Sequence, residues 1–339
     1  MFSFTPLNFC LVSLSLLSLS FGTYAQTERD GYRQVNTLLS QAHMDIIRDG
    51  QLHSICTYNA GFAWGEGIDP DEVCSKGVVD PDSCSRKWDN SEEPAGILAK
   101  IISTGKFKWC LPEADLCPDN DESCIKNGFV GVAEEDNELQ GIAKGDYYGN
   151  IIDTFNALTI TMGKILHVPL KPKIVVIKST DEGRFQEMTD ALASNKCYAT
   201  QDNWYRHPYR EAVVDFTCPT GGVDSAGFAL HALPSSGINL EDVYSSDGEG
   251  VSVCDPGTGS TQNALARRDL PKAEFIAVDF SDLANALCRN DCDVLAREIS
   301  LTPELWITEN GCPEEPITFG IAAPSSGGGF SGALTHRAV

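Results

Sequence analysis

The stretch GVSVCDPGTGSTQNALARR, residues 250–268, carries three signals of an α/β fold in direct succession. Its apolar run around Val253 is typical of a buried strand, and the Gly-rich segment Asp255–Thr261 predicts a tight turn. The residues that follow have the spacing of a helix. A strand, a short turn and a helix in this order indicate one unit of a parallel α/β sheet.

The same alternation continues on both sides of this stretch, from residue 96 to residue 324. A Pro- and Gly-containing break at residues 219–222 divides it into two series. Two series predict two lobes with a ligand cleft between them, because ligands of such sheets bind beyond the carboxyl ends of the strands. Helices are expected at residues 95–104, 149–163, 183–195 and 281–290, and strands at 106–111, 173–179, 196–200, 213–217, 227–233, 273–280, 292–296 and 317–324.

The two ends of the chain depart from this alternation. Residues 1–25 contain the apolar run CLVSLSLLSLSF, which predicts a secretory signal cleaved near Ala25 and a secreted, extracellular or periplasmic-like location. The run is shorter than a membrane span requires, so no membrane insertion is expected. Residues 26–97 predict an acidic, cysteine-bearing extension with a helix at 35–50 and a strand at 51–58, and residues 327–339 predict a flexible tail.

Cysteine usage and charge limit the classes of function. Of the 13 cysteines, Cys10 lies in the predicted signal, which leaves an even number in a compartment where thiols oxidise. Their spacing lacks the Cys-x-x-Cys pairs of a structural zinc site, so disulfides are expected rather than a metal. The formal net charge of −23 argues against nucleic acid and anionic membrane surfaces as partners.

Familiar catalytic and cofactor motifs are missing from the sequence. It has no Gly-x-Ser-x-Gly or His-Glu-x-x-His pattern, and DPGTGST lacks the lysine and the glycine spacing of a P-loop. The acidic loop CPDNDESC lacks the length and the glycine placement of an EF-hand. No cofactor or metal is therefore expected, and the expected partner is a small molecule.

Three features have the chemistry to hold a charged small molecule. The N–H groups of Asp255–Thr261 precede a helix whose dipole favours an anion, although an ordinary strand-to-helix turn has the same composition. Arg210 could pair with a carboxylate through two parallel hydrogen bonds, or it could be surface charge. Glu298 follows a strand of the second series, where it could take an ammonium group or be a solvated loop acid.

In this order, these segments resemble the type II periplasmic binding fold, and within it the extracellular solute-binding family 3 that captures amino acids. YREAVVDFT (209–217) is similar to the family's Glu-Arg…Val-Asp-Phe-Ser signature, and SVCDPGTGST (252–261) to its Gly-Thr-Gly-Ser loop. STGKFKWCLP (103–112) resembles its opening strand, and ITFGIAAPSS (317–326) resembles the strand that crosses back. The resemblance implies lobe 1 at residues 98–218, lobe 2 at 219–317 and a return strand to lobe 1 at 318–326.

The resemblance also implies roles for matching residues. Arg210 would clamp the α-carboxylate of an amino acid, together with the backbone N–H groups of Gly259 and Ser260 from lobe 2. Glu298 stands where the family usually has an aspartate for the α-ammonium group, so its longer side chain would shift that group. Arg206 is an alternative clamp.

The loops around this implied site are less regular. Asn203 and Tyr205 occupy positions of the family's ligand loop. The loop where the family places an aromatic lid is an insertion here, EADLCPDNDESCIKNG (113–128), and Phe129 is a candidate for the lid. The chain also stops where the family continues into two helices of lobe 1. VNTLLSQAHMDIIRDGQLHSIC (35–56) reads like that missing piece, and we expect it to pack on lobe 1 as a circularly moved replacement.

Three functions remain open at this stage. The leading one is a secreted solute-binding protein that captures a small amino acid or a related zwitterion without catalysis. A second is a secreted dehydratase of the cyclohexadienyl or arogenate type on the same fold, with Glu298 as the acid. A third is a sensor or interaction module whose cleft is degenerate. The fold alone does not choose among them.

Overall fold

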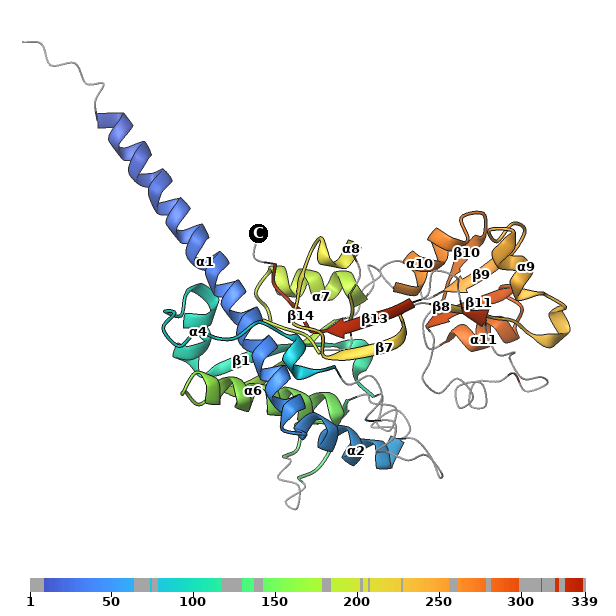
Figure 1. The fold of residues 1–339 in the computed structure, drawn as a ribbon, viewed down its shortest axis with the longest axis horizontal. Helices are drawn as coiled ribbons and strands as arrows, with labels where there is room; N and C mark the ends of the chain where they lie inside the picture. The colour runs from blue at the N-terminus through green and yellow to red at the C-terminus, as the bar shows by residue number, and fades with distance from the viewer. Residues whose placement is uncertain are drawn as a thin grey trace, which may run out of the picture.

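The computed structural model shows two bodies joined by a pair of long strands, with one long helix crossing the first body (Figure 1). The first body is lobe 1 and the second is lobe 2. The structure describes residues 9–63, 74, 79–117, 130–136, 143–178, 184–201, 204–206, 208–226, 228–255, 261–278, 282–298, 312, 321–322 and 327–337.

Lobe 1 is built on a short mixed sheet. β1 (Lys106–Pro112) pairs in parallel with β4 (Lys171–Ile177). Trp109 of β1 bridges Ala199 in parallel, and Ala199 in turn bridges β14 (Leu334–Thr335), which pairs with β6 (Asp215–Phe216). The strands predicted at 106–111, 173–179 and 213–217 are thus confirmed in position, whereas the one predicted at 196–200 is reduced to the bridge at Ala199.

Three helices pack against this sheet and confirm the helices predicted from the sequence. They are α4 (Gly96–Thr104), α6 (Asn150–Ile165) and α7 (Arg184–Ala193). The Trp109 ring stacks on that of Phe155 in α6 with 4.3 Å between centroids, and its indole N–H donates to Thr159 Oγ1 at 2.9 Å. Alternate residues of β1 therefore seal the sheet against α6, as a strand with one buried face requires.

The N-terminal extension forms two helices, α1 (Phe9–Arg48) and α2 (Gln51–Ala63), separated at Gly50, whose φ is +69°. The helix predicted at 35–50 is confirmed as the end of a longer one. The strand predicted at 51–58 is wrong. Leu52 and Ile55, one helical turn apart, pack against the lobe 1 core, so this segment buries its apolar residues with helical rather than strand periodicity.

One face of α1 belongs to the core of lobe 1, as expected for residues 35–56. Leu38, Leu39 and Ala42 are fully buried in the same cluster as Phe107 and Trp109 of β1. Figure 1 shows the blue helix lying along this lobe between α4 and α6. The predicted packing is confirmed, and the idea of a circularly moved replacement remains an interpretation of it.

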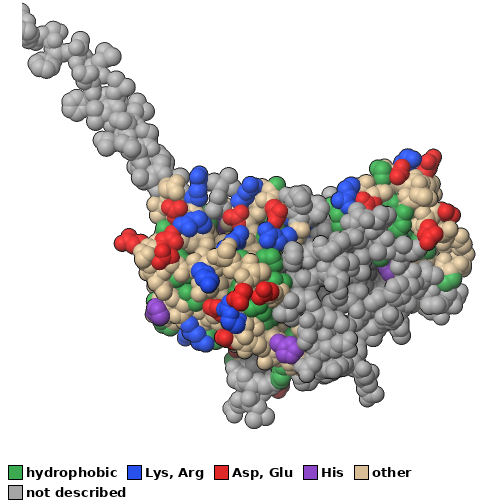
Figure 2. Space-filling view, in the orientation of Figure 1, with side chains coloured by type: hydrophobic (Ala, Val, Ile, Leu, Met, Phe, Trp, Pro, Cys, Tyr) green, Lys and Arg blue, Asp and Glu red, His purple; other side chains and the backbone are tan. Residues whose placement is uncertain are grey.

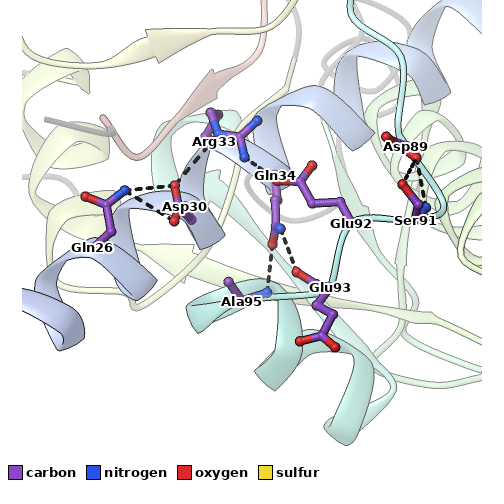
Figure 3. A network of polar contacts seen from close by, with 9 residues as sticks. All are labelled: Gln26, Asp30, Arg33, Gln34, Asp89, Ser91, Glu92, Glu93 and Ala95. Carbon is purple, nitrogen blue, oxygen red and sulfur yellow. Dashed lines mark hydrogen bonds and ion pairs between the residues drawn. The ribbon is translucent and has the colours of Figure 1, made fainter.

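Polar contacts fix α1 to the segment that enters α4 (Figure 3). The Gln34 amide accepts the backbone N–H of Ala95 at 2.8 Å and donates to the carbonyl of Glu93 at 2.8 Å. Arg33 pairs with Glu92 beside it. A Cβ added to Gly31 would lie 2.6 Å from the Ala95 carbonyl oxygen, so only glycine lets the two backbones approach this closely.

Lobe 2 contains a five-stranded sheet in the order β10-β9-β11-β8-β12. β9 is parallel to β10 and β11, whereas β8 is antiparallel to both of its neighbours. The strand and helix of the stretch 250–268 are confirmed as β9 and α10. The elements are β8 (Phe228–His231), α9 (Leu240–Ser245), β9 (Ser252–Asp255), α10 (Thr261–Asp269), β10 (Glu274–Ala277), α11 (Leu283–Cys288), β11 (Val294–Glu298) and β12 (Ile321–Ala322).

Two antiparallel strands, β7 (Gly221–Ala226) and β13 (Gly327–Gly332), connect the lobes. β7 leads into β8 of lobe 2, and β12 leads back into β13, as the two ribbons between the bodies in Figure 1 show. The flexible tail predicted at 327–339 is therefore wrong for most of its length. Its glycines suit a strand flanked closely by two others, and Ala333, Leu334 and Thr335 after it are buried.

Disulfides tie each lobe together, as the cysteine count predicted. Cys84–Cys218 joins the extension to the end of β6, and Cys110–Cys197 lies inside lobe 1. Cys254–Cys292 and Cys288–Cys312 lie in lobe 2, and Cys56–Cys74 lies in the extension. Cys117 is disulfide-bonded as well.

Short elements complete the described chain. They are η1 (Pro81–Ser83), η2 (Glu113–Asp115), β2 (Gly131–Val132), β3 (Tyr147–Tyr148), β5 (Trp204–Tyr205), α8 (Pro208–Glu211) and η4 (Pro234–Ser236). Acidic and basic side chains are interspersed over the lobe 1 face seen in Figure 2. In the described segments, no helix has both the length and the apolar character of a membrane span.

Candidate functional site

Polar side chains follow the carboxyl ends of three parallel segments in lobe 1. Asp115 comes three residues after β1, Arg184 opens the helix that follows β4, and Gln201 comes two residues after the bridge at Ala199. An Arg184 guanidinium nitrogen lies 2.6 Å from Asp115 Oδ2, and Gln201 Nε2 donates to the same oxygen at 2.8 Å. They meet at the edge where open parallel sheets bind their ligands.

Asp115 is a carboxylate held deep in the protein, with 2% of its surface exposed. Burial raises its pKa above the usual value for an aspartate, because the charged form loses hydration, while Arg184 and Gln201 act in the opposite direction. The Arg184 side chain is 41% exposed, so it reaches from solvent to the buried acid. Asp115 and Arg184 therefore compensate each other's charge.

Arg210 lies beside this cluster, on the short helix α8. Arg210 is 5% exposed. This excludes the interpretation that it is a surface charge. Its guanidinium carbon lies 5.0 Å from the ring centroid of Phe185 and 5.3 Å from that of Trp204, within the range of cation–π attraction. Two aromatic rings and the buried position hold the Arg210 guanidinium in a fixed place beside Phe185 and Trp204.

Arg206, the alternative clamp, is occupied elsewhere. Its Nε and one terminal nitrogen donate to Glu211 Oε1 at 3.0 and 2.8 Å, and its guanidinium lies 5.7 Å from the Phe216 ring. It is partly exposed, with 31% of the side chain accessible. Of the two arginines that the sequence left open, Arg210 is the buried one, and it lies beside Phe185 and Trp204.

One lobe 2 candidate, Glu298, lies at the carboxyl edge of the second sheet. Glu298 is the last residue of β11, and Asp255 is the last residue of the neighbouring parallel strand β9. Asp255 is fully buried and accepts a hydrogen bond from Asn263 of α10 at 2.8 Å. The backbone position predicted for Glu298 at a strand end is confirmed.

Several sequence candidates fall outside the described residues. Gly259, Ser260, Asn203 and Phe129 are among them. Tyr205 is described only as part of β5, whose backbone pairs with β13. Their roles in ligand binding stay predictions.

Sequence reasoning missed four residues of the lobe 1 cluster, namely Asp115, Arg184, Gln201 and Trp204. Asp115 was hidden in an acidic insertion, where a carboxylate is normally solvated. One signal was present: Asp115 comes three residues after β1, and Gln201 and Trp204 lie between the last parallel segment and Arg210. Residues just after parallel strands have a positional reason to line a site.

Comparison with solved structures finds chains of similar architecture. PfVFT1 of Plasmodium falciparum has a TM-score of 0.52 at 12% identity, over 93% of this chain and 99% of that chain. AncCDT-1, an ancestral amino acid-binding protein described as a precursor of cyclohexadienyl dehydratase, has 0.47 at 16%, over 71% and 86%. The cysteine-binding protein from Campylobacter jejuni has 0.45 at 17%, over 70% and 79%. No protein-family model matches the sequence, and no curated protein matches it.

The two-lobe fold of type II periplasmic binding proteins, predicted from the sequence, is confirmed. The likeness to PfVFT1 extends over nearly the whole of both chains, so the N-terminal extension belongs largely to the architecture they share. At 12% identity this likeness concerns the fold, and function has to be argued from the site.

Proposed function

We propose that this two-lobe protein binds a small amino acid or a related zwitterion between its lobes, without catalysis. The observation that carries the proposal is the burial of Arg210 beside the carboxyl edge of the lobe 1 sheet. A buried guanidinium is costly unless an anion or a hydrogen-bond network compensates it, and its planar fork matches a carboxylate. Phe185 and Trp204 flank this guanidinium, so its planar fork is held in a fixed orientation for such a carboxylate.

Lobe 2 supplies the complementary half of the proposed site. Glu298 ends β11, so its carboxylate would take the α-ammonium group of the ligand. Gly259 and Ser260 lie between β9 and α10 in the sequence and would add backbone N–H groups to the α-carboxylate. A zwitterion would then be satisfied only when both lobes contact it, so binding would favour closure of the lobes.

The disulfides support a secreted location for this activity, because such bonds persist in oxidising compartments. We propose that residues 1–25 act as the secretory signal, cleaved near Ala25. N-terminal sequencing of the secreted protein tests this, and a mature chain that begins elsewhere contradicts the cleavage site.

A thermal-shift and calorimetric screen against the amino acids tests the proposed function. At 100 times its Kd, a ligand raises the free energy of unfolding by roughly 2.7 kcal/mol. Arg210→Met is expected to weaken binding about 100-fold, because it removes one partner of a buried charge pair. Arg210→Lys, which keeps the charge and loses the fork, is expected to have an intermediate affinity.

Arg206→Met is the matched control, since it removes a nearby arginine that is engaged by Glu211. It should leave the affinity for the ligand unchanged. If no amino acid shifts the unfolding transition, the binding function is refuted, and an interaction module becomes the better explanation. If prephenate or arogenate is turned over and Glu298→Gln abolishes the turnover, the protein is a dehydratase instead.

A further inference from the structure

Two buried polar atoms of the lobe 1 cluster lack a hydrogen-bond partner within the described part of the chain. They are the indole Nε1 of Trp204 and the side-chain oxygen Oε1 of Gln201. Trp204 is 6% exposed and Gln201 is 4% exposed, so solvent does not readily replace the missing partners. Leaving such atoms unpaired costs about 1–3 kcal/mol each, which makes them candidates for contact with a ligand.

The chemical character of both atoms is fixed. An indole N–H donates and cannot accept. The Gln201 amide is oriented by Asp115, because the group that points at the carboxylate Oδ2 at 2.8 Å has to be the donating nitrogen. The other end of the amide is therefore the oxygen, which accepts. The pair consists of one donor and one acceptor, both neutral.

Arg184 lies close to the residues that carry both atoms. Its guanidinium carbon lies 5.4 Å from the Trp204 ring centroid, and a terminal nitrogen bonds Asp115, which also receives Gln201. The guanidinium carbon of Arg210 lies 5.3 Å from the centroid of the same Trp204 ring. The donor and the acceptor thus belong to the same cluster as the proposed carboxylate clamp.

From this donor–acceptor pair we infer that the ligand is an amino acid with a side-chain carboxamide, such as glutamine or asparagine; the inference rests on the function proposed above. The carbonyl of a carboxamide would accept from Trp204 Nε1, and its NH₂ group would donate to Gln201 Oε1. One planar group would then satisfy both atoms.

Other side chains satisfy the pair less well. A carboxylate side chain has no proton for Gln201 Oε1 and would lie near Asp115. An ammonium or guanidinium group cannot accept from Trp204 Nε1 and would lie near Arg184, whose charge is already matched by Asp115. An aliphatic side chain leaves both atoms unpaired. A hydroxyl group can donate and accept, but only through one oxygen.

The experiment measures affinities of the full chain by calorimetry for L-glutamine, L-asparagine, L-glutamate, L-norleucine, L-lysine and L-serine. A carboxamide amino acid is expected to bind at least tenfold more tightly than norleucine, which has similar length and no polar side-chain atom. Trp204→Phe and Gln201→Met should each reduce this preference about tenfold, since each removes one hydrogen bond, with little effect on norleucine.

Trp109→Phe is the matched control. Its indole N–H already has a partner in Thr159, so the variant should lower the melting temperature and leave the ratio of affinities unchanged. Trp204→Phe removes a donor without a described partner, so it should lower the melting temperature without ligand by less than Trp109→Phe does. This readout does not depend on any ligand.

The outcomes separate the inference from the proposed function. Binding of an amino acid with no preference for a carboxamide over norleucine, or a preference for serine or lysine, overturns the inference and leaves the function standing. A preference that survives in Trp204→Phe and Gln201→Met also overturns it. Absence of any amino acid binding overturns both.

Discussion

Lobe 1 gathers its core from segments far apart in the sequence, whereas lobe 2 closes its core over consecutive segments. The core of lobe 1 joins Leu39 of α1 with Trp109 of β1, Phe155 of α6 and Ala333 next to β14. The core of lobe 2 lies between Leu230 and Ala296, with two disulfides across it. The first lobe thus depends on both ends of the chain, and the second depends on local units and cross-links.

The largest expected effect comes from removing one disulfide from each lobe. Cys84→Ser/Cys218→Ser opens a loop with a sequence separation of 134 residues, and Cys288→Ser/Cys312→Ser opens one of 24. Loop-closure entropy predicts losses of roughly 5 and 3.5 kcal/mol in the free energy of unfolding. Chemical denaturation followed by hydrogen exchange in each lobe measures both.

The larger loss should appear in lobe 1 and loosen the extension, because Cys84–Cys218 ties the extension to β6. Arg86 also donates to the Phe216 carbonyl at 2.7 Å. The extension is therefore held to β6 by a hydrogen bond as well as by the disulfide. A larger loss for the lobe 2 pair would contradict the view that the extension is part of lobe 1.

The second prediction concerns the apolar face of α1. Leu39→Ala should lower the free energy of unfolding of lobe 1 by about 3 kcal/mol, because it leaves a cavity in a fully buried site. Arg33→Ala, on the exposed side of the same helix, should change it by about 0.5 kcal/mol or less. Urea denaturation of both variants measures the difference, and equal effects would mean that α1 is not held by its apolar face.

The same contrast explains how much of the fold the sequence predicts. In lobe 2, β9 and α10 follow from signals within residues 250–268, because a strand, a Gly-rich turn and a helix are local. In lobe 1, α2 and β13 were misjudged. Leu52 becomes helical by packing on a core built from distant residues, and β13 exists because β5 and β7 flank it. Tertiary context overrides local propensity there.

The candidate site divides in the same way. Arg210 could be proposed as a site residue because a family signature surrounds it, and Glu298 because it ends a recognisable strand, and their roles stay predictions. Asp115 and Gln201 were not, since their contact joins residues separated by 86 positions in the chain. The amino-acid sequence around each residue contains no pattern that predicts burial. Only the parallel arrangement of β1 and the Ala199 bridge brings them together.

The smallest expected effect on stability concerns the amino-terminal ends of β1 and β4, at the edge of the lobe 1 sheet away from the candidate site. Lysines on the two strands face one another there. Lys106 is the cross-strand partner of Lys171, and Lys108 is the partner of Lys173. Burial and the charges of Lys100 and Lys173 lower the pKa of Lys108 below its usual value. Like charges directly opposite each other destabilise a strand pair, although lysines on an outer strand also discourage edge-to-edge association.

Lys173→Glu should therefore stabilise lobe 1 by roughly 0.2–1 kcal/mol and return the pKa of Lys108 towards its ordinary value, because an opposite charge replaces a like one. Lys178→Glu, beyond the end of β4, is the control and should have less effect. The gain should shrink in 1 M salt, where screening removes interactions between exposed charges. A gain that persists in high salt would show that the effect is not electrostatic, and association of Lys173→Glu at high concentration would show that the lysines protect the edge of the sheet.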